Sequence, residues 1–343
     1  MNSFFQLIPR LPPPVCGVGD HARRLATALE ARGVESVLVP YHGEADWRQV
    51  LRSSVKTDGP VTWLVHYSGY GYAKRGAPLA LLRELRRLRR DCPGVRLLTM
   101  FHELYASGPP WTSAFWLSPL QRQVAAGLAC LSDAVFTNRQ ASGEWLRARL
   151  PAAVPVTVRP VFSNFGEWAD PTPPAARPAR LLLFGGGPPR TQGFWPQVEA
   201  AMERLQLPEL VVVSHALDVP AALAARVAVR QTGVLEPEAM AEELRAARCG
   251  GLEYNPDFLG KSGVLAAYAA FGVVPLLTRG RGRLSEGLEE GRHFLSPVDL
   301  GQGADLANVQ TELRHWYEGH SIEASAEAYG EIGVASASPP RRM

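Results

Sequence analysis

The chain has 343 residues, with 36 Lys and Arg against 33 Asp and Glu, which gives a formal net charge of +3. At roughly 150 residues per domain, this length predicts two domains. With 46% hydrophobic and 20% charged residues, the composition excludes a disordered chain, a disulfide-rich miniprotein and a collagen-like repeat, and the small net charge gives no argument for nucleic-acid binding.

In the first half of the chain, apolar strands alternate with amphipathic helices, an order that predicts a parallel sheet covered on both faces. Strands are expected at 35–41, 61–67, 95–103 and 133–138, and helices at 19–32, 77–90 and 141–149. The helix at 77–90 carries a cluster of five arginines: Arg83, Arg86, Arg87, Arg89 and Arg90. Such a cluster is typical of a solvated face, and contact with anionic lipid headgroups is the alternative.

A proline-rich stretch divides the chain. ADPTPPAARPAR holds four prolines and no apolar periodicity, which predicts an interdomain linker. A second alternating series follows, with strands at 180–187, 209–215, 225–233, 249–255 and 273–278, and helices at 194–206, 218–227, 236–248 and 262–272. We therefore expect a Rossmann-like domain at 1–168, a linker at 169–179, a second domain at 180–304, a helix at 305–330 and a disordered tail at 331–343.

Nothing in the chain predicts export or a membrane span. The N-terminus has no basic start and three consecutive prolines, so it is a poor signal peptide. No apolar run reaches about 18 residues. The four cysteines, Cys16, Cys92, Cys130 and Cys249, form no CxxC pair, which is typical of buried, reduced thiols. We expect a cytoplasmic protein.

The first of four unusual loops is CGVGDHA, which opens the first helix. Gly17 and Gly19 allow a ligand to approach the backbone, and the helix N-terminus offers N–H groups to an anion. The alternative is a plain turn in which Asp20 is the N-cap. Both interpretations stay open, because a short Gly-x-Gly alone is a weak signal.

The second loop, FGGGPPRTQG, follows a predicted strand. Gly186 and Gly187 suit a phosphate or sugar held close to the backbone, and Arg190 is a candidate partner for phosphate oxygens. Pro188 breaks the Gly-x-Gly-x-x-Gly spacing, so a dinucleotide fingerprint is not expected. A tight turn with a surface arginine is the alternative.

The third loop contains Gly-Lys-Ser-Gly at the junction of a strand, a loop and a helix. A P-loop requires glycine where Asn255 stands, so a P-loop NTPase is not expected. Ser262 can cap the helix, while Gly263, the helix dipole and Lys261 attract an anion such as a diphosphate. Only three lysines occur in the chain, which argues against the alternative that Lys261 is an ordinary surface residue.

The fourth feature pairs two aromatic loops, HYSGYGYAKRG and MFHELYASGPPW. His102 and Glu103 end a predicted strand, and Tyr70 and Tyr105 flank them, a combination that suits a sugar. A structural histidine is the alternative. Position 106 is Ala, so His-Glu-x-x-His is absent and no metal site is expected. No Gly-x-Ser-x-Gly elbow occurs, which argues against that type of serine hydrolase.

Across nearly its whole length the chain resembles the family 4 type of GT-B glycosyltransferase. The resemblance rests on GVGDHA at the first helix, HYSGYGYAKRGAP and FHELYASGPPW in the first half, RLLLFGGG and TGVLEPEAMAEELRAARCGGLEYNP in the second, and the closing WYEGHSIEASAEAY. It implies an α/β, GT-B architecture, in which two Rossmann-like domains face each other across a cleft and the last helix crosses back to the first domain.

The resemblance implies a retaining, metal-independent hexosyltransferase that moves a sugar from a nucleotide-diphosphate sugar to an acceptor hydroxyl in glycan or polysaccharide biosynthesis. His102 and Asp20 would be catalytic, and Tyr70, Glu103 and Tyr105 would bind a glycan, lipid-linked or small-molecule acceptor. The donor would be held by Gly17, Gly19, Gly186, Gly187, Arg190, Asn255, Lys261, Ser262 and Gly263. No cofactor and no nucleic-acid partner are implied, and peripheral contact with the inner membrane face is an option.

One departure from the family pattern concerns function. Family members carry two glutamates eight residues apart, near the donor sugar and the ribose, and the corresponding positions here are Leu259 and Ala267. The alternative is therefore a catalytically silent GT-B protein that binds a sugar or a partner glycosyltransferase. A third option is a GT-B isomerase such as a 2-epimerase, although the required carboxylate cluster is not evident in the second domain.

Overall fold

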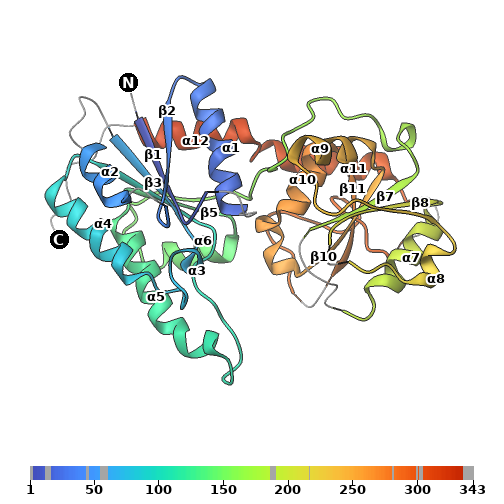
Figure 1. The fold of residues 1–343 in the computed structure, drawn as a ribbon, viewed down its shortest axis with the longest axis horizontal. Coiled ribbons are helices and arrows are strands. Elements are labelled where there is room, and N and C mark those ends of the chain that lie inside the picture. The colour runs from blue at the N-terminus through green and yellow to red at the C-terminus, as the bar shows by residue number, and fades with distance from the viewer. Residues whose placement is uncertain are drawn as a thin grey trace. The chain divides into compact units, whose positions relative to one another are not determined.

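The computed structural model describes residues 3–11, 17–43, 46–54, 61–185, 191–215, 217–279, 282–298, 300 and 304–334 (Figure 1). Two compact units make up the chain. Unit 1 comprises Met1–Pro160 and Ile322–Met343, and unit 2 comprises Val161–Ser321. Each unit is an α/β layer structure built on one parallel sheet.

Unit 1 has six strands in the order β2-β1-β3-β4-β5-β6. The strands are β1 (Ser3–Ile8), β2 (Glu35–Pro40), β3 (Val61–Tyr67), β4 (Arg96–Phe101), β5 (Ala134–Thr137) and β6 (Val156–Val158). The helices are α1 (Gly17–Ala31), α2 (Trp47–Ser54), α3 (Gly69–Tyr72), α4 (Leu79–Asp91), α5 (Ser113–Leu131), α6 (Gln140–Arg147) and α12 (Ile322–Val334).

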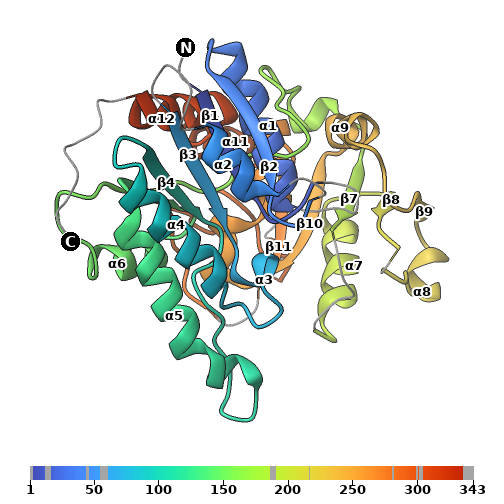
Figure 2. The same cartoon turned by 60° about the vertical axis from the view of Figure 1, so that its left-hand side comes forward.

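Helices cover both faces of the unit 1 sheet. Alternate side chains of β3, such as Trp63 and Val65, pack in the core cluster that α4 and α5 complete. The other face carries α1 and α12, which contact each other (Figures 1 and 2), and there Phe136 of β5 stacks on Tyr329 of α12. All seven residues of β3 are buried, as expected for a strand with helices on both sides.

Unit 2 has five strands in the order β11-β10-β7-β8-β9. The strands are β7 (Arg180–Phe184), β8 (Glu209–Val213), β9 (Ala228–Gln231), β10 (Cys249–Tyr254) and β11 (Val274–Arg279). The helices are α7 (Phe194–Arg204), α8 (Ala221–Ala224), α9 (Pro237–Ala246), α10 (Gly263–Phe271) and α11 (Leu306–Glu318), with 3₁₀ segments η1 (Pro174–Ala176) and η2 (Pro256–Lys261).

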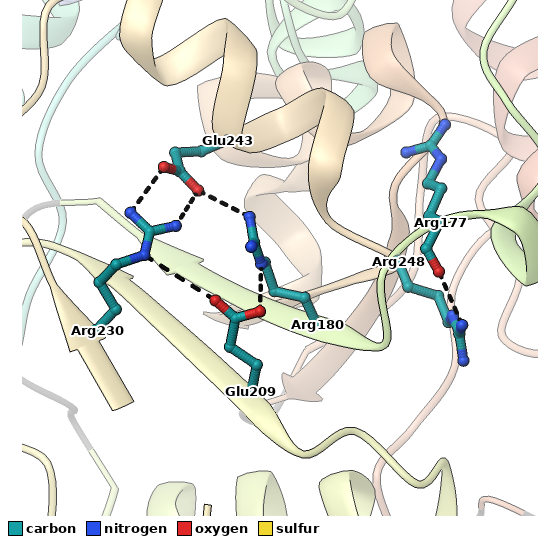
Figure 3. Close-up of polar contacts among 6 residues, drawn as sticks. All are labelled: Arg177, Arg180, Glu209, Arg230, Glu243 and Arg248. Atoms are coloured by element: carbon teal, nitrogen blue, oxygen red, sulfur yellow. Dashed lines mark hydrogen bonds and ion pairs between the residues drawn. The ribbon is translucent and has the colours of Figure 1, made fainter. Parts of the chain in front are cut away.

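Charged side chains join the amino ends of the unit 2 strands. The carboxylate of Glu243 lies between the guanidinium groups of Arg180 and Arg230 (Figure 3), at 3.2 Å and 2.6 Å. Glu209 also pairs with Arg180, at 2.9 Å. Arg180 and Glu209 begin β7 and β8, so this ion-pair cluster lies at the edge opposite the one where parallel sheets bind ligands, and it stabilises the unit.

Arg177 links three segments of unit 2. Its guanidinium donates to the carbonyl oxygens of Thr172, Ala247 and Phe271 at 2.8, 3.0 and 2.8 Å. Ala247 and Phe271 end helices α9 and α10, whose last carbonyls lack intrahelical partners. Arg177 is 3% exposed, and this burial lowers the pKa of its guanidinium to about 10.

The proline-rich segment is therefore not a free linker, and this corrects the expected domain boundaries. The division between the units falls after Pro160, and residues 161–179 belong to unit 2. Arg177 and the buried Pro174 fix the segment against the ends of two helices. Prolines restrict the backbone of this segment without making it independent of the domain.

The C-terminal helix expected at 305–330 is two helices, α11 and α12. Helix α11 belongs to unit 2 and α12 to unit 1, and the break between them lies at Gly319–Ser321. Residues 331–334, expected in a disordered tail, complete α12, and the remaining tail lies outside the described residues. The thiol of Cys249 is buried as expected, but that of Cys130 is exposed.

The sequence patterns also missed five elements of unit 1, namely β1, α2, α3, α5 and β6. Strand β1 follows directly on the initial residues, and helix α5 contains Pro119 and apolar residues around much of its circumference. Within the described ranges, no helix combines the length and apolarity that crossing a bilayer demands.

Replacing Arg177 by Met should lower the free energy of unfolding of unit 2 by about 2–4 kcal/mol, because three carbonyl oxygens lose a charged donor. Urea denaturation measures the change. Arg83→Met, at an exposed position of α4, is the control and should stay within about 0.5 kcal/mol of the parent. Equal stability of the Arg177→Met variant and the parent would show that the contacts are dispensable.

Candidate functional site

The carboxyl ends of β3 and β4 bring two histidines together in unit 1. His66 is the penultimate residue of β3 and His102 follows β4, and the two strands pair directly. The side chain of His66 is fully buried, and His102 is 9% exposed. Because the strands of a parallel sheet end at one edge, the two imidazoles meet where such sheets bind ligands.

A chain of hydrogen bonds sets which nitrogens of these rings carry protons. Nε2 of Gln6 donates to Oγ of Ser36 at 2.8 Å, and Oε1 of Gln6 lies 2.7 Å from Nε2 of His66, which therefore carries a proton. Nδ1 of neutral His66 is then an acceptor for the Nε2–H of His102, 3.1 Å away.

His21 of α1 completes the cluster. Its ring lies edge-on to those of His102 and His66, with centroid distances of 5.0 and 5.8 Å. Burial, with a smaller contribution from the charge of His102, lowers the pKa of His21 and of His66 well below 6.5. At pH 7 both imidazoles are therefore neutral.

The same three histidines form a group, among the described residues, whose ligand atoms could approach one metal ion. These atoms lie within 4.8 Å of one another. Nδ1 of His66 and Nε2 of His102 lie 3.1 Å apart, a hydrogen-bond distance, and a metal ion would have to replace this hydrogen bond. We therefore interpret the cluster as a hydrogen-bond network, and the expectation of a metal-independent protein stays a prediction.

Helix α1 brings Asp20 towards this cluster. The helix begins at Gly17, so Asp20 lies in its first turn and is not the N-cap residue. The carboxylate is 3.9 Å from Arg23 and its side chain is 30% exposed. His21, the next residue, contacts His102. Gly17 is exposed and Gly19 is buried, and residues 12–16, which lead into the helix, lie outside the described residues.

The three expected acceptor residues lie in the segments that follow β3 and β4. Tyr70, in α3, is 45% exposed, and its hydroxyl accepts a hydrogen bond from the side-chain amide of Gln121. Glu103 is exposed. The ring of Tyr105 packs under the guanidinium of Arg122 at 4.3 Å. Tyr70 and Glu103 are thus exposed, and Tyr105 packs against Arg122.

In unit 2, the N-terminus of α10 lies at the carboxyl end of β10. The side chain of Ser262 accepts a hydrogen bond from the N–H of Leu265 at 3.2 Å, as expected for an N-cap. Among the described residues, no atom lies within 4 Å of a Cβ added to Gly263, so they leave this side of the helix end uncovered. The first N–H groups of a helix lack intrahelical partners, which makes this end suited to an anion.

Lys261 and Asn255 lie at the two ends of η2, beside that helix terminus. Nζ of Lys261 is 5.3 Å from the ring centroid of Phe258, a cation–π contact. The side chain of Asn255 accepts a hydrogen bond from the N–H of Asp257 at 3.0 Å and so caps η2. The structure therefore brings Lys261 to the open helix end, and it gives the side-chain oxygen of Asn255 a structural role.

Gly185, which directly follows β7, lies beside the first turn of α10. Gly185 has a φ of +122°, which favours glycine, and a Cβ there would lie 3.3 Å from Val264 of α10. The expected donor residues Gly186, Gly187 and Arg190 come directly afterwards and lie outside the described residues.

The two positions at which family 4 enzymes have glutamates are buried here. Leu259 is 1% exposed and Ala267, in α10, is fully buried. A nearby carboxylate, Asp257, accepts a hydrogen bond from the N–H of Arg283 at 2.9 Å. At this edge of unit 2, the described groups that suit an anion are thus N–H donors and Lys261, and the glutamate pair of the family pattern is missing.

The sequence reading missed His21, His66 and Gln6. A signal existed, because His66 and His102 both stand near the ends of predicted strands, and neighbouring parallel strands end at one edge. Gln6 is a polar residue within the apolar run SFFQLI, and a buried polar side chain needs a partner. Strand order, which the sequence did not supply, is what makes them neighbours.

No family model and no curated protein matches this sequence. Solved structures do match nearly the whole chain. A variant of S. aureus TarM in complex with fondaparinux, α-GlcNAc-glycerol and UDP has a TM-score of 0.59 at 10% identity and covers 98% of this chain and 100% of its own. Anabaena HepE in complex with UDP and glucose has a TM-score of 0.54 at 13% identity, with coverages of 96% and 98%.

A third structure, a Listeria monocytogenes protein assigned as a UDP-N-acetylglucosamine 2-epimerase, has a TM-score of 0.58 at 14% identity and covers 99% of both chains. The chain therefore has the GT-B fold, as the sequence predicted. At these identities the similarity shows the fold alone, and the fold is shared by glycosyltransferases and epimerases.

The stability of unit 1 should fall below pH 6.5, because His21 and His66 bind protons in the unfolded chain but not in the folded one. With two such groups, the free energy of the unfolding that exposes β3 should fall by up to about 2.7 kcal/mol per pH unit between pH 6.5 and 5. Hydrogen exchange of the β3 amides measures it.

His66→Gln should halve this slope. The matched control is His315→Gln, at an exposed position of unit 2, which should leave the slope for β3 as it is. Opening free energies that stay constant over this pH range would contradict the assignment of neutral, buried imidazoles.

Proposed function

We propose that this chain is a retaining glycosyltransferase that moves a hexose from a nucleotide-diphosphate sugar to an acceptor hydroxyl, in glycan or polysaccharide biosynthesis. The observation that carries the proposal is the open N-terminus of α10, where Ser262 caps the helix and Lys261 adjoins it. Such a terminus is suited to an anion such as a diphosphate.

The donor site is proposed at this terminus. The N–H groups of Gly263 and Val264 and the ammonium of Lys261 would bind the diphosphate, together with the segment that holds Gly186, Gly187 and Arg190. During transfer the diphosphate leaves with additional negative charge, which fixed N–H donors and a cation stabilise. No metal ion is included in this proposal.

Unit 1 would supply the groups that contact the sugars. His102, whose Nε2 lies 3.1 Å from Nδ1 of His66, is proposed to hydrogen-bond a sugar hydroxyl, and Gln6 and His66 fix the position of its ring. Asp20 is proposed to orient the acceptor hydroxyl, and Tyr70 and Glu103, both exposed, are proposed to bind the acceptor. The neighbours TarM and HepE, both in complex with UDP, support this class of donor.

A catalytically silent GT-B protein is the second candidate, and a specific observation favours it. The positions of the two family glutamates are the buried side chains Leu259 and Ala267, so carboxylate contacts to the donor sugar and ribose are missing there. A silent protein would fold as described and bind a sugar or a partner glycosyltransferase without holding a nucleotide.

Calorimetric titration with UDP, GDP and ADP tests the donor site. One of the three should bind with micromolar affinity, insensitive to magnesium. Gly263→Leu should weaken that binding at least ~10-fold, because the new side chain fills the space in front of the helix. The matched control is Gly319→Leu at the end of α11, which also has no atom within 4 Å of an added Cβ and should bind as the parent does.

Lys261→Ala should reduce turnover at least ~10²-fold through loss of a charged donor to the leaving group. Lys74→Ala, which removes an exposed lysine of unit 1, is the control and should keep full turnover with a soluble acceptor. No binding of any nucleotide would favour the silent protein. Conversion of the donor alone into an epimerised sugar nucleotide would replace transfer by isomerisation.

A further inference from the structure

The first turns of α5 extend beyond the rest of unit 1. Helices α4 and α5 run side by side in the same direction, since Gln121 contacts the Arg75 carbonyl just before α4 and Gly127 lies beside Leu82 within it. Residues 113–120 therefore continue past the N-terminus of α4, and Figures 1 and 2 both show this end of α5 projecting from the unit. We call residues 108–120 the aromatic projection.

The aromatic projection exposes large apolar side chains. Trp111 is 84% exposed, Trp116 is 72%, Phe115 is 42% and Leu120 is 38%. Scattered exposed apolar residues are ordinary, but four within ten residues of one convex tip are not. So many exposed apolar side chains indicate that the aromatic projection contacts a partner with an apolar phase.

Hydrogen bonds hold these side chains in place. Thr112 caps α5, since its hydroxyl donates to the Pro109 carbonyl at 2.7 Å and accepts from the N–H of Phe115. The indole N–H of Trp116 donates to the Pro110 carbonyl at 2.8 Å. Because this N–H has an internal partner, the Trp116 ring can leave water without losing a hydrogen bond.

The charge around the aromatic projection is positive. Between residues 104 and 132 the chain has no Asp or Glu and a single cation, Arg122. At the base of the projection, Lys74 and Arg75 are exposed in the loop that contacts Gln121. Arg83 is exposed one turn into α4. An apolar tip with positive charges at its foot is complementary to an anionic lipid surface.

The arginine cluster of α4 fits such a role less well. Arg89 pairs with Asp133 at 2.8 Å, Arg87 with Glu84 at 2.6 Å, and Arg90 with the adjacent Asp91. Three of its five cations thus have acidic partners within the protein. The aromatic projection is therefore a better candidate for contact with anionic lipid than the arginine cluster of α4.

We propose that the aromatic projection docks unit 1 on an anionic bilayer. Trp111, Phe115 and Trp116 insert at the level of the headgroups, and Lys74 and Arg75 contact lipid phosphates. A convex apolar tip suits a deformable bilayer, whereas a protein partner would need a matching pocket. Docking does not depend on the transfer reaction; if the proposed function holds as well, it favours the lipid-linked class of acceptor.

Vesicle flotation of the full chain tests this proposal. The protein should float with vesicles of phosphatidylcholine containing 30% phosphatidylglycerol, and less with phosphatidylcholine alone or at 0.5 M NaCl (about 4 Å Debye length). Trp111→Ala/Trp116→Ala should lower the partition coefficient at least ~10-fold on both kinds of vesicle. Lys74→Gln/Arg75→Gln should lower it by about 5-fold per cation on the anionic vesicles only.

The matched control is Val234→Ala/Val298→Ala, which removes two exposed apolar side chains of unit 2 and should float as the parent does. Both tryptophans are exposed, so circular dichroism should show a folded double variant. The proposal is wrong if the parent does not float, if the tryptophan variant floats equally, or if size-exclusion chromatography shows that the tryptophans hold two copies of the chain together.

Discussion

Every strand pair in the two sheets is parallel, and the placement of the chemistry follows from this constraint. Parallel strands need helical crossovers, so their carboxyl ends share one edge at which helix N-termini also gather. In unit 1 that edge holds His66 and His102, and in unit 2 it holds the terminus capped by Ser262. The opposite edge of unit 2 carries the ion pair of Arg180 and Glu209, which joins β7 and β8.

The two edges differ in electrostatic character. In unit 1, burial keeps His21 and His66 neutral. That edge therefore offers uncharged hydrogen-bond donors and acceptors, which suit hydroxyl groups. In unit 2, the helix terminus and Lys261 offer positive potential, which suits an anion. Considered separately, unit 1 thus suits hydroxyl groups and unit 2 suits an anion.

Much of the fold could be predicted from the sequence, because strands such as VTWLVHY and RLLLF are continuous apolar runs between amphipathic helices. Ser262 was predictable as an N-cap because capping depends only on a serine directly before the helix. His66 and Gln6 were not, because their contact depends on strand order, and the proline-rich segment was misread because the hydrogen bonds of Arg177 to Thr172, Ala247 and Phe271 join residues far apart in the chain.

Helix α5 was missed for a different reason, and that reason also bears on the aromatic projection. Sequence periodicity finds a helix by the contrast between a buried face and a solvated face. The later turns of α5 show that contrast, with Gln121, Val124 and Leu128 buried, but its first turns carry Phe115, Trp116 and Leu120 outward without a polar face. A segment that only connects β4 to α5 does not need two exposed indoles, those of Trp111 and Trp116. The indole N–H of Trp116 is moreover bonded to the Pro110 carbonyl. The lack of amphipathic contrast is therefore itself a sign that water is not the only medium this end meets.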